Sequence, residues 1–169
     1  PADSPQASLD QVLNAAACAP HFVGLLRAVI EGSTPTGRKN LLKALIGKGQ
    51  DFFSEGERLA GALLKCAATR GKGARDVAAA YIQLCEDTAR EQIAFRREGA
   101  YSQTDFHSVR EAVYDNPEVM ESYMDGLLLS QVLWDNHWTL LGFARNEFFA
   151  PYCLASPLHV EIGPGHGWF

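Results

Sequence analysis

Hydrophobic residues recur at intervals of three and four along nearly all of residues 1–157, and the alternation typical of β-strands is almost absent there. This spacing places apolar side chains on one face of an α-helix. It predicts a mainly α fold, a multi-helix bundle over residues 1–150. The proline-containing stretch that follows, with Pro151 and Pro157, predicts a linker.

Local signals mark where the helices are expected to begin and end. We expect Pro20 to open a helix that Gly32 closes, residues 33–37 to form a loop, and residues 70–73 to precede a long helix over 74–97. That long helix is the expected backbone of the bundle. Further start signals are the capping boxes Ser8 with Gln11 and Ser54 with Glu57, and Asn116 followed by Pro117.

Residues 118–149 are the most apolar part of the helical region. They hold too many large apolar side chains for one narrow stripe, so we expect burial on several sides, by the bundle and by a further surface. Trp134 and Trp138 lie one helical turn apart and suit core or dimer-interface anchors. A homodimer or larger assembly through the apolar helices is therefore expected.

A group of polar residues is embedded in this apolar region. Buried polar groups are costly unless they are hydrogen-bonded, so the group either makes bonds between helices or lines a ligand cavity. Together they are the candidates for a substrate-facing wall, with His137 as a general base or orienting group. The members are Tyr123, Ser130, Gln131, Asn136 and His137.

The last twelve residues form a different kind of sequence, in which a short β-prone run leads into a glycine-rich turn. Glycine lets the backbone turn tightly and approach a ligand closely. The spacing of Gly163, Gly165 and Gly167 is G-x-G-x-G. A dinucleotide-binding loop has the spacing G-x-G-x-x-G and would need its third glycine at position 168, which is Trp168.

This segment resembles motif I of the class I S-adenosylmethionine-dependent methyltransferases, with an apolar strand, an acidic residue, an apolar residue and the glycine loop in order. The resemblance implies the first strand and glycine loop of a Rossmann-like domain over residues 151–169. It implies that Gly163, Gly165 and Gly167 line S-adenosylmethionine and that Glu161 lies near its ammonium group. The preceding helices resemble the helical lead-in of methyltransferases that act on small molecules, where they form a lid, an acceptor pocket and a dimer contact.

A lone strand cannot pair its backbone groups or bury both faces. We therefore expect the chain to be the N-terminal part of a longer methyltransferase, to bind the cofactor weakly by itself and to be inactive. Two alternatives stay open. The glycine segment could be a Gly/Pro-rich tail, and the chain could be a non-enzymatic helical interaction module that oligomerises through residues 127–143.

Composition narrows the choice of partners and compartment. A net charge of −5, from 15 basic and 20 acidic side chains, argues against a nucleic-acid binder. The longest charge-free run, residues 11–26, is too short for a membrane span and contains Pro20. The start lacks the basic segment of a secretory signal. A cytoplasmic protein is expected.

The remaining chemistry-bearing residues favour structural roles. Four cysteines without a C-x-x-C pair predict reduced core thiols, namely Cys18, Cys66, Cys85 and Cys153. No Glu-x-x-His occurs, and the pairs His107 with Glu111 and Asp135 with His137 are too few ligands for a metal site, so no metal is expected. Nucleophile-elbow and Walker motifs are absent from the sequence.

Overall fold

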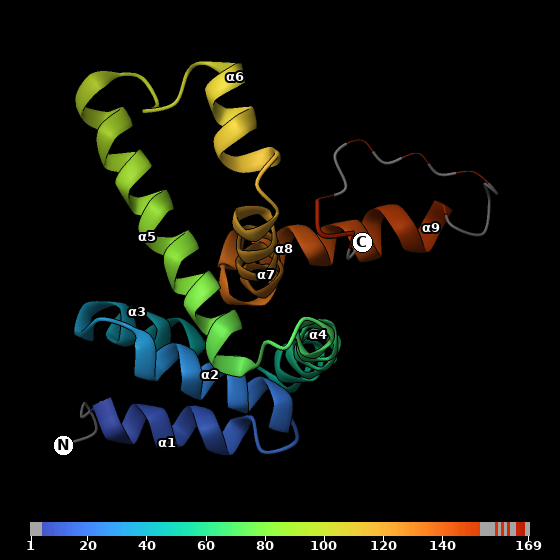
Figure 1. The fold of residues 1–169 in the computed structure, drawn as a ribbon. Coiled ribbons are helices and arrows are strands. Elements are labelled where there is room, and N and C mark those ends of the chain that lie inside the picture. Colours follow the sequence, from blue (N-terminus) through green and yellow to red (C-terminus); the bar gives the residue numbers. More distant parts are fainter. Residues whose placement is uncertain (1–4, 153–157, 159, 161, 163–164, 168–169) are drawn as a thin grey trace.

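The computed structural model describes residues 5–152, 158, 160, 162 and 165–167, and these form a bundle of helices (Figure 1). The helical architecture predicted from the periodicity is confirmed. The elements are α1 (Pro5–Ala15), α2 (Pro20–Gly32), α3 (Pro35–Leu45), α4 (Gln50–Thr69), α5 (Ala74–Glu98), α6 (Phe106–Val109), the π-helix η1 (Arg110–Tyr114), α7 (Pro117–Leu133), α8 (Asp135–Phe143), the π-helix η2 (Ala144–Phe149) and α9 (Ala150–Tyr152).

Most helix boundaries follow the local signals. Pro20 and Pro117 occupy the first turns of α2 and α7, and the Asn116 side chain accepts a hydrogen bond from the Val119 N–H. The long helix is present as α5 and ends at Gly99, whose φ of 71° suits glycine.

Both predicted capping boxes are wrong, and so is part of a predicted loop. Helix α1 already begins at Pro5, three residues ahead of the expected cap. Helix α4 begins at Gln50, because Gly49 is the N-cap there. Glu57 instead accepts a hydrogen bond from the Phe22 N–H, 3.0 Å away, and so satisfies a donor in the first turn of α2. In the expected 33–37 loop, α3 starts at Pro35.

The core lies where α2, α4, α5 and α7 meet, as Figure 1 shows. Helix α5 packs against both α2 and α7, which confirms its predicted central place. Two glycines allow close helix approach. A Cβ at Gly56 would lie 2.6 Å from the Phe22 ring, and a Cβ at Gly126 would lie 2.7 Å from the Ala80 carbonyl oxygen.

The apolar region 118–149 does not form one buried helix. Trp134 adopts an extended backbone (φ −103°, ψ 124°) and separates α7 from α8. Helix α7 is largely buried on one side, but α8, η2 and α9 continue as a rod that leaves the bundle (Figure 1). Leu140 and Phe143 on this rod are 55% and 58% exposed. The expected burial on several sides is therefore absent beyond Leu141 in the described residues.

The predicted strand at 158–162 is not formed by the residues described there. Leu158 and Val160 lie outside regular secondary structure, and Ile162 is 95% exposed. A strand needs a neighbour to pair its backbone groups, and no other strand occurs in the described residues.

The prediction of core thiols is wrong for Cys18 and Cys66, which are exposed, while Cys85 is half-buried. Helical phase explains the difference on α4, because the neighbouring Ala67 occupies the buried face. Cys153 lies outside the described residues. None of the helices in the described part of the chain has the length and apolarity required to cross a membrane.

Candidate functional site

The break at Trp134 folds the start of α8 back toward the last turn of α7. Ser130 and Gln131 lie in that last turn, and His137 lies in the first turn of α8. Because the chain turns between them, residues six and seven apart in sequence come within hydrogen-bond distance. The structure thus brings together three of the five polar residues singled out from the sequence.

The Ser130 hydroxyl fixes the orientation of the His137 ring. Ser130 is fully buried, and its hydroxyl donates to the Leu127 carbonyl oxygen over 2.6 Å. A hydroxyl has one hydrogen, so the 2.9 Å contact between Ser130 Oγ and His137 Nδ1 requires an N–H at Nδ1. In the neutral ring, the lone pair is then at Nε2.

The surroundings keep this ring neutral. Burial lowers the pKa of His137 below its ordinary value, and hydrogen bonding to the Ser130 backbone acts in the opposite direction without outweighing it. The Trp134 ring packs beside it, with centroids 4.9 Å apart. A neutral imidazole with a lone pair at Nε2 is able to accept a proton at neutral pH.

The other members of the predicted group are arranged differently. The Gln131 amide nitrogen lies 3.4 Å from both Leu127 O and His137 Nδ1, which is long for a hydrogen bond, so Ser130 is the principal partner of the ring. Asn136 is exposed. Tyr123 is exposed as well and lines a different cavity, of about 530 Å³, between α5, η1 and α7.

The described part of the glycine loop lies against α7. Gly165 and Gly167 have φ values of 57° and 64°, a conformation that favours glycine. A Cβ at Gly165 would lie 3.9 Å from Leu127 Cδ2, which is within van der Waals contact, whereas a Cβ at Gly167 would meet no atom within 4 Å. Leu127 is also the residue whose carbonyl accepts from Ser130. Glu161 and Gly163 lie outside the described residues.

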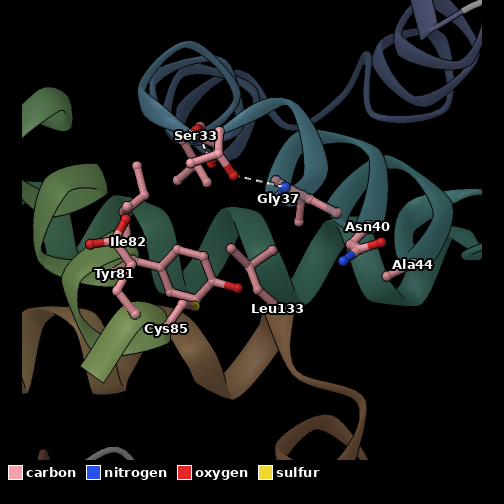
Figure 2. A pocket seen from close by; sticks show the side chains of 12 residues that line it. Ser33, Gly37, Asn40, Ala44, Tyr81, Ile82, Cys85 and Leu133 are labelled. Atoms are coloured by element: carbon pink, nitrogen blue, oxygen red, sulfur yellow. Dashed lines mark hydrogen bonds between the residues drawn. The ribbon is translucent and has the colours of Figure 1, made fainter. Parts of the chain in front are cut away.

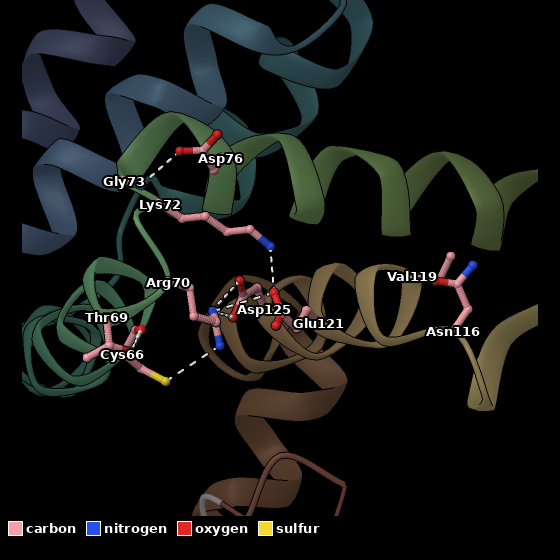
Figure 3. A network of polar contacts seen from close by, with 10 residues as sticks. All are labelled: Cys66, Thr69, Arg70, Lys72, Gly73, Asp76, Asn116, Val119, Glu121 and Asp125. Atoms are coloured by element: carbon pink, nitrogen blue, oxygen red, sulfur yellow. Dashed lines mark hydrogen bonds and ion pairs between the residues drawn. The ribbon is translucent and has the colours of Figure 1, made fainter.

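A charged network that the sequence reasoning missed joins the α4–α5 turn to α7 (Figure 3). Arg70 Nη2 lies 2.7 Å from both carboxylate oxygens of the buried Asp125, and Lys72 binds Glu121 over 2.8 Å. Hydrogen bonding to Asp125 raises the pKa of Arg70. The sequence did carry one indication of this network, namely Asp125 in an otherwise apolar helix, because a buried carboxylate needs a cationic partner.

A second charged cluster ties the rod to α4. The buried Glu55 carboxylate contacts Arg58 over 2.6 Å and Arg145 of η2 over 2.8 Å. Burial alone would raise the pKa of Glu55, but the two arginines outweigh it and lower that pKa. No sequence signal links Glu55 to Arg145, because the two are far apart in the chain.

Within the described residues, no group of three or more His, Cys, Asp or Glu side chains is arranged to hold a metal ion. Comparison of the chain with protein-family models, curated proteins and solved structures found no match.

Proposed function

We propose that this chain is the helical N-terminal part, first strand and glycine loop of a class I methyltransferase that uses S-adenosylmethionine to methylate a small molecule. The observation that carries the proposal is the G-x-G-x-G segment, two of whose glycines have positive φ. Of these glycines, Gly165 lies beside Leu127, which is one helical turn before Ser130, the partner of His137, in α7.

The described glycines are compatible with a cofactor loop. Gly165 has one side against Leu127, and Gly167 is open to its surroundings, so the backbone presents a surface that no side chain obstructs. Gly163, Gly165, Gly167 and Glu161 are the residues proposed to hold S-adenosylmethionine, which supplies an electrophilic methyl group when bound.

The chain's own contribution to the reaction is proposed to be at α7 and α8. His137 Nε2 would accept the proton that the acceptor loses on methylation, and Ser130 would hold the ring in the required tautomer. Gln131 is the proposed substrate contact beside them. Tyr123 and Asn136 do not join this cluster, so any contact they make with substrate would be on other faces.

The proposal assigns activity to a protein that pairs the 158–162 segment with further strands. A nucleotide-binding sheet buries both faces of its strands, whereas Val160 and Ile162 are strongly exposed in this chain. The isolated chain is therefore expected to bind S-adenosylmethionine weakly and to be inactive.

Calorimetric titration of S-adenosylmethionine into the product of the complete gene, and in parallel into this chain, tests the proposal. We expect the complete product to bind more tightly, and Gly165→Val and Gly167→Val to weaken its affinity at least about tenfold, because a side chain strains the loop and obstructs the ligand. Gly99→Val is the matched control, since Gly99 also has positive φ and has open space around it.

The variants are first checked for native helix content by circular dichroism. Absence of binding to the complete product would contradict the proposal. So would equal loss of affinity in Gly99→Val, because the effect would then belong to backbone strain in general.

A second candidate function is a helical interaction module. It is favoured by the exposed apolar side chains on α8, η2 and α9, since a contiguous apolar surface in a folded protein marks a contact site. Under this alternative, the glycine segment binds no cofactor and both forms of the protein give no heat with S-adenosylmethionine.

A further inference from the structure

A cavity of about 340 Å³ lies between the C-terminal end of α2, α3, the middle of α5 and the end of α7 (Figure 2). Its lining is mainly apolar and includes Val29, Leu41 and Leu133. This volume is within the range of small-molecule sites in proteins. The cavity is lined by none of the residues assigned above to the cofactor loop or to the His137 cluster.

The Tyr81 ring projects from α5 among the lining residues, as Figure 2 shows, and Tyr81 is only 7% exposed. The side chains of Trp134 and Cys85 lie beside this hydroxyl and influence its pKa. An indole N–H can only donate, so Trp134 offers the Tyr81 hydroxyl a donor and no acceptor. Of these two neighbours, Cys85 alone offers an acceptor for the hydroxyl hydrogen.

Sulfur is a weak hydrogen-bond acceptor, so Cys85 is a poor partner for this buried donor. An oxygen acceptor placed in the cavity would form a stronger bond with it. Burial raises the pKa of Tyr81, which keeps the hydroxyl protonated and able to donate. The polar groups Ser33 and Thr34 at the rim are already occupied, by the Val29 carbonyl and the Gly37 N–H. Asn40, the remaining polar residue of the lining with a side-chain amide, is exposed.

The charge of the lining residues limits the charge of a ligand that the cavity can bind. Glu86 is its single charged residue, and neither lysine nor arginine is present among the described residues that line it. A buried anion without a cationic partner is strongly disfavoured. An anionic ligand is therefore disfavoured, and the apolar lining with the Tyr81 hydroxyl suits a ligand with an apolar body and an acceptor oxygen.

We propose that this cavity binds a small neutral carbonyl compound, whose oxygen accepts a hydrogen bond from Tyr81 and whose apolar body packs against Val29, Leu41 and Leu133. The site stands independently of the methyltransferase proposal, because it uses neither the glycine loop nor His137. The half-buried Cys85 thiol at its wall reports on occupancy.

Protection of Cys85 from iodoacetamide, followed by mass spectrometry of the cysteine peptides, tests the proposal on the whole chain. The probes are acetophenone, ethylbenzene, which has a similar shape without the oxygen, and benzoate, which carries a negative charge. Cys18 and Cys66 are exposed and serve as internal controls for the reagent. We expect acetophenone to slow alkylation of Cys85 alone, with an affinity about tenfold better than ethylbenzene, and benzoate to give no protection.

Two variants distinguish the contribution of the Tyr81 hydrogen bond from that of the cavity volume. Tyr81→Phe keeps the ring and is expected to remove the difference between acetophenone and ethylbenzene, whereas Tyr101→Phe, at an exposed tyrosine, is expected to keep it. Ala44→Leu fills part of the cavity without removing a polar group, and it is expected to abolish protection by both probes. Equal protection by the two probes in the unaltered chain, or no protection of Cys85 by either, would overturn the proposal.

Discussion

At the scale of single residues, one hydroxyl determines the chemistry available to His137. Ser130 is bound to the Leu127 carbonyl and so can only accept from the imidazole, which directs the free lone pair to Nε2. A histidine whose Nδ1 faced a carbonyl or a carboxylate instead would also carry its proton at Nδ1. A charged carboxylate partner would in addition raise the pKa of the imidazole. Here burial is the dominant influence, and the ring stays neutral.

This environment predicts a pH dependence of stability. Burial holds the pKa of His137 below 6.5 in the folded chain, so at pH values between the two pKa values the unfolded chain binds more protons than the folded one. The stability is complete above pH 6.5 and is lost as the pH falls through the folded pKa. Because the ring is half-exposed and solvent screens it, we expect a loss of at most about 1 kcal/mol.

Urea unfolding at pH 7.5 and pH 5.5 measures this effect when the chain is compared with His137→Gln. The variant should lose less stability on acidification, since its side chain does not titrate, while His107→Gln, at an exposed histidine, should behave like the unaltered chain. Identical losses in all three would show that His137 does not titrate differently in the folded state.

At the scale of elements, helix pairs are held close by glycines and tied by long-range ion pairs. Gly126 lets α7 approach the α5 backbone, and the nearby Asp125 pairs with Arg70 of the α4–α5 turn. These consecutive residues of α7 meet two different elements, Gly126 the α5 backbone and Asp125 the α4–α5 turn, and so they tie α5, α7 and the turn together (Figure 3).

Substitution of Gly126 by alanine is expected to destabilise the fold. An added Cβ would lie 2.7 Å from the Ala80 carbonyl oxygen, a backbone atom that cannot move aside without separating the helices. Overpacking of this kind costs about 1–3 kcal/mol, which exceeds the gain of up to about 1 kcal/mol in helix propensity. Thermal unfolding followed by circular dichroism measures the change.

Gly61→Ala in α4 is the matched control for this prediction. No atom lies within 4 Å of a Cβ at that position, so only the propensity gain remains and the variant should be more stable than the unaltered chain. A destabilised Gly61→Ala, or a Gly126→Ala that melts at a higher temperature than the unaltered chain, would contradict the packing argument.

The sequence predicted elements wherever the deciding signal was local. Pro20, Gly32, Asn116 and Gly99 mark boundaries through backbone geometry and capping, which act within a few residues. The break at Trp134 has neither proline nor glycine to announce it. Glu57 has the spacing of a capping-box residue, yet it serves a different helix, because tertiary packing offers it a second set of N–H donors.

For the candidate site, sequence patterns found His137, Ser130 and Gln131 because they are polar residues in an apolar region. They did not show which members of the group would meet, since that depends on the turn between α7 and α8. Likewise, nothing local links Glu55 to Arg145 or Tyr81 to the cavity beside α3.

At the scale of the whole molecule, the bundle is packed around the first half of α5, up to Leu84, while the rod of α8, η2 and α9, which leaves the bundle in Figure 1, has large exposed apolar side chains. The Glu55 and Arg145 pair fixes the middle of this rod, at the beginning of η2, against α4, so its exposed face is held in place. An apolar surface on an ordered element favours association more than one on a loose segment, because less conformational entropy is lost on contact.

We therefore expect the isolated chain to self-associate through the rod. Sedimentation velocity should show a concentration-dependent dimer or larger species, because burying aromatic side chains contributes roughly 25 cal/mol for each Å² removed from water. The double variant with Phe143→Ser and Phe148→Ser should be monomeric at the same concentrations, since both rings are at least half exposed and their removal leaves the core unchanged. Phe106→Ser provides the comparison, because this ring is 66% exposed but lies on α6, away from the rod.

If the complete gene product covers the rod with a further domain, that product should stay monomeric while the short chain associates. A chain that sediments as a monomer at every concentration, or an assembly that survives the double variant, would exclude the rod as the contact surface.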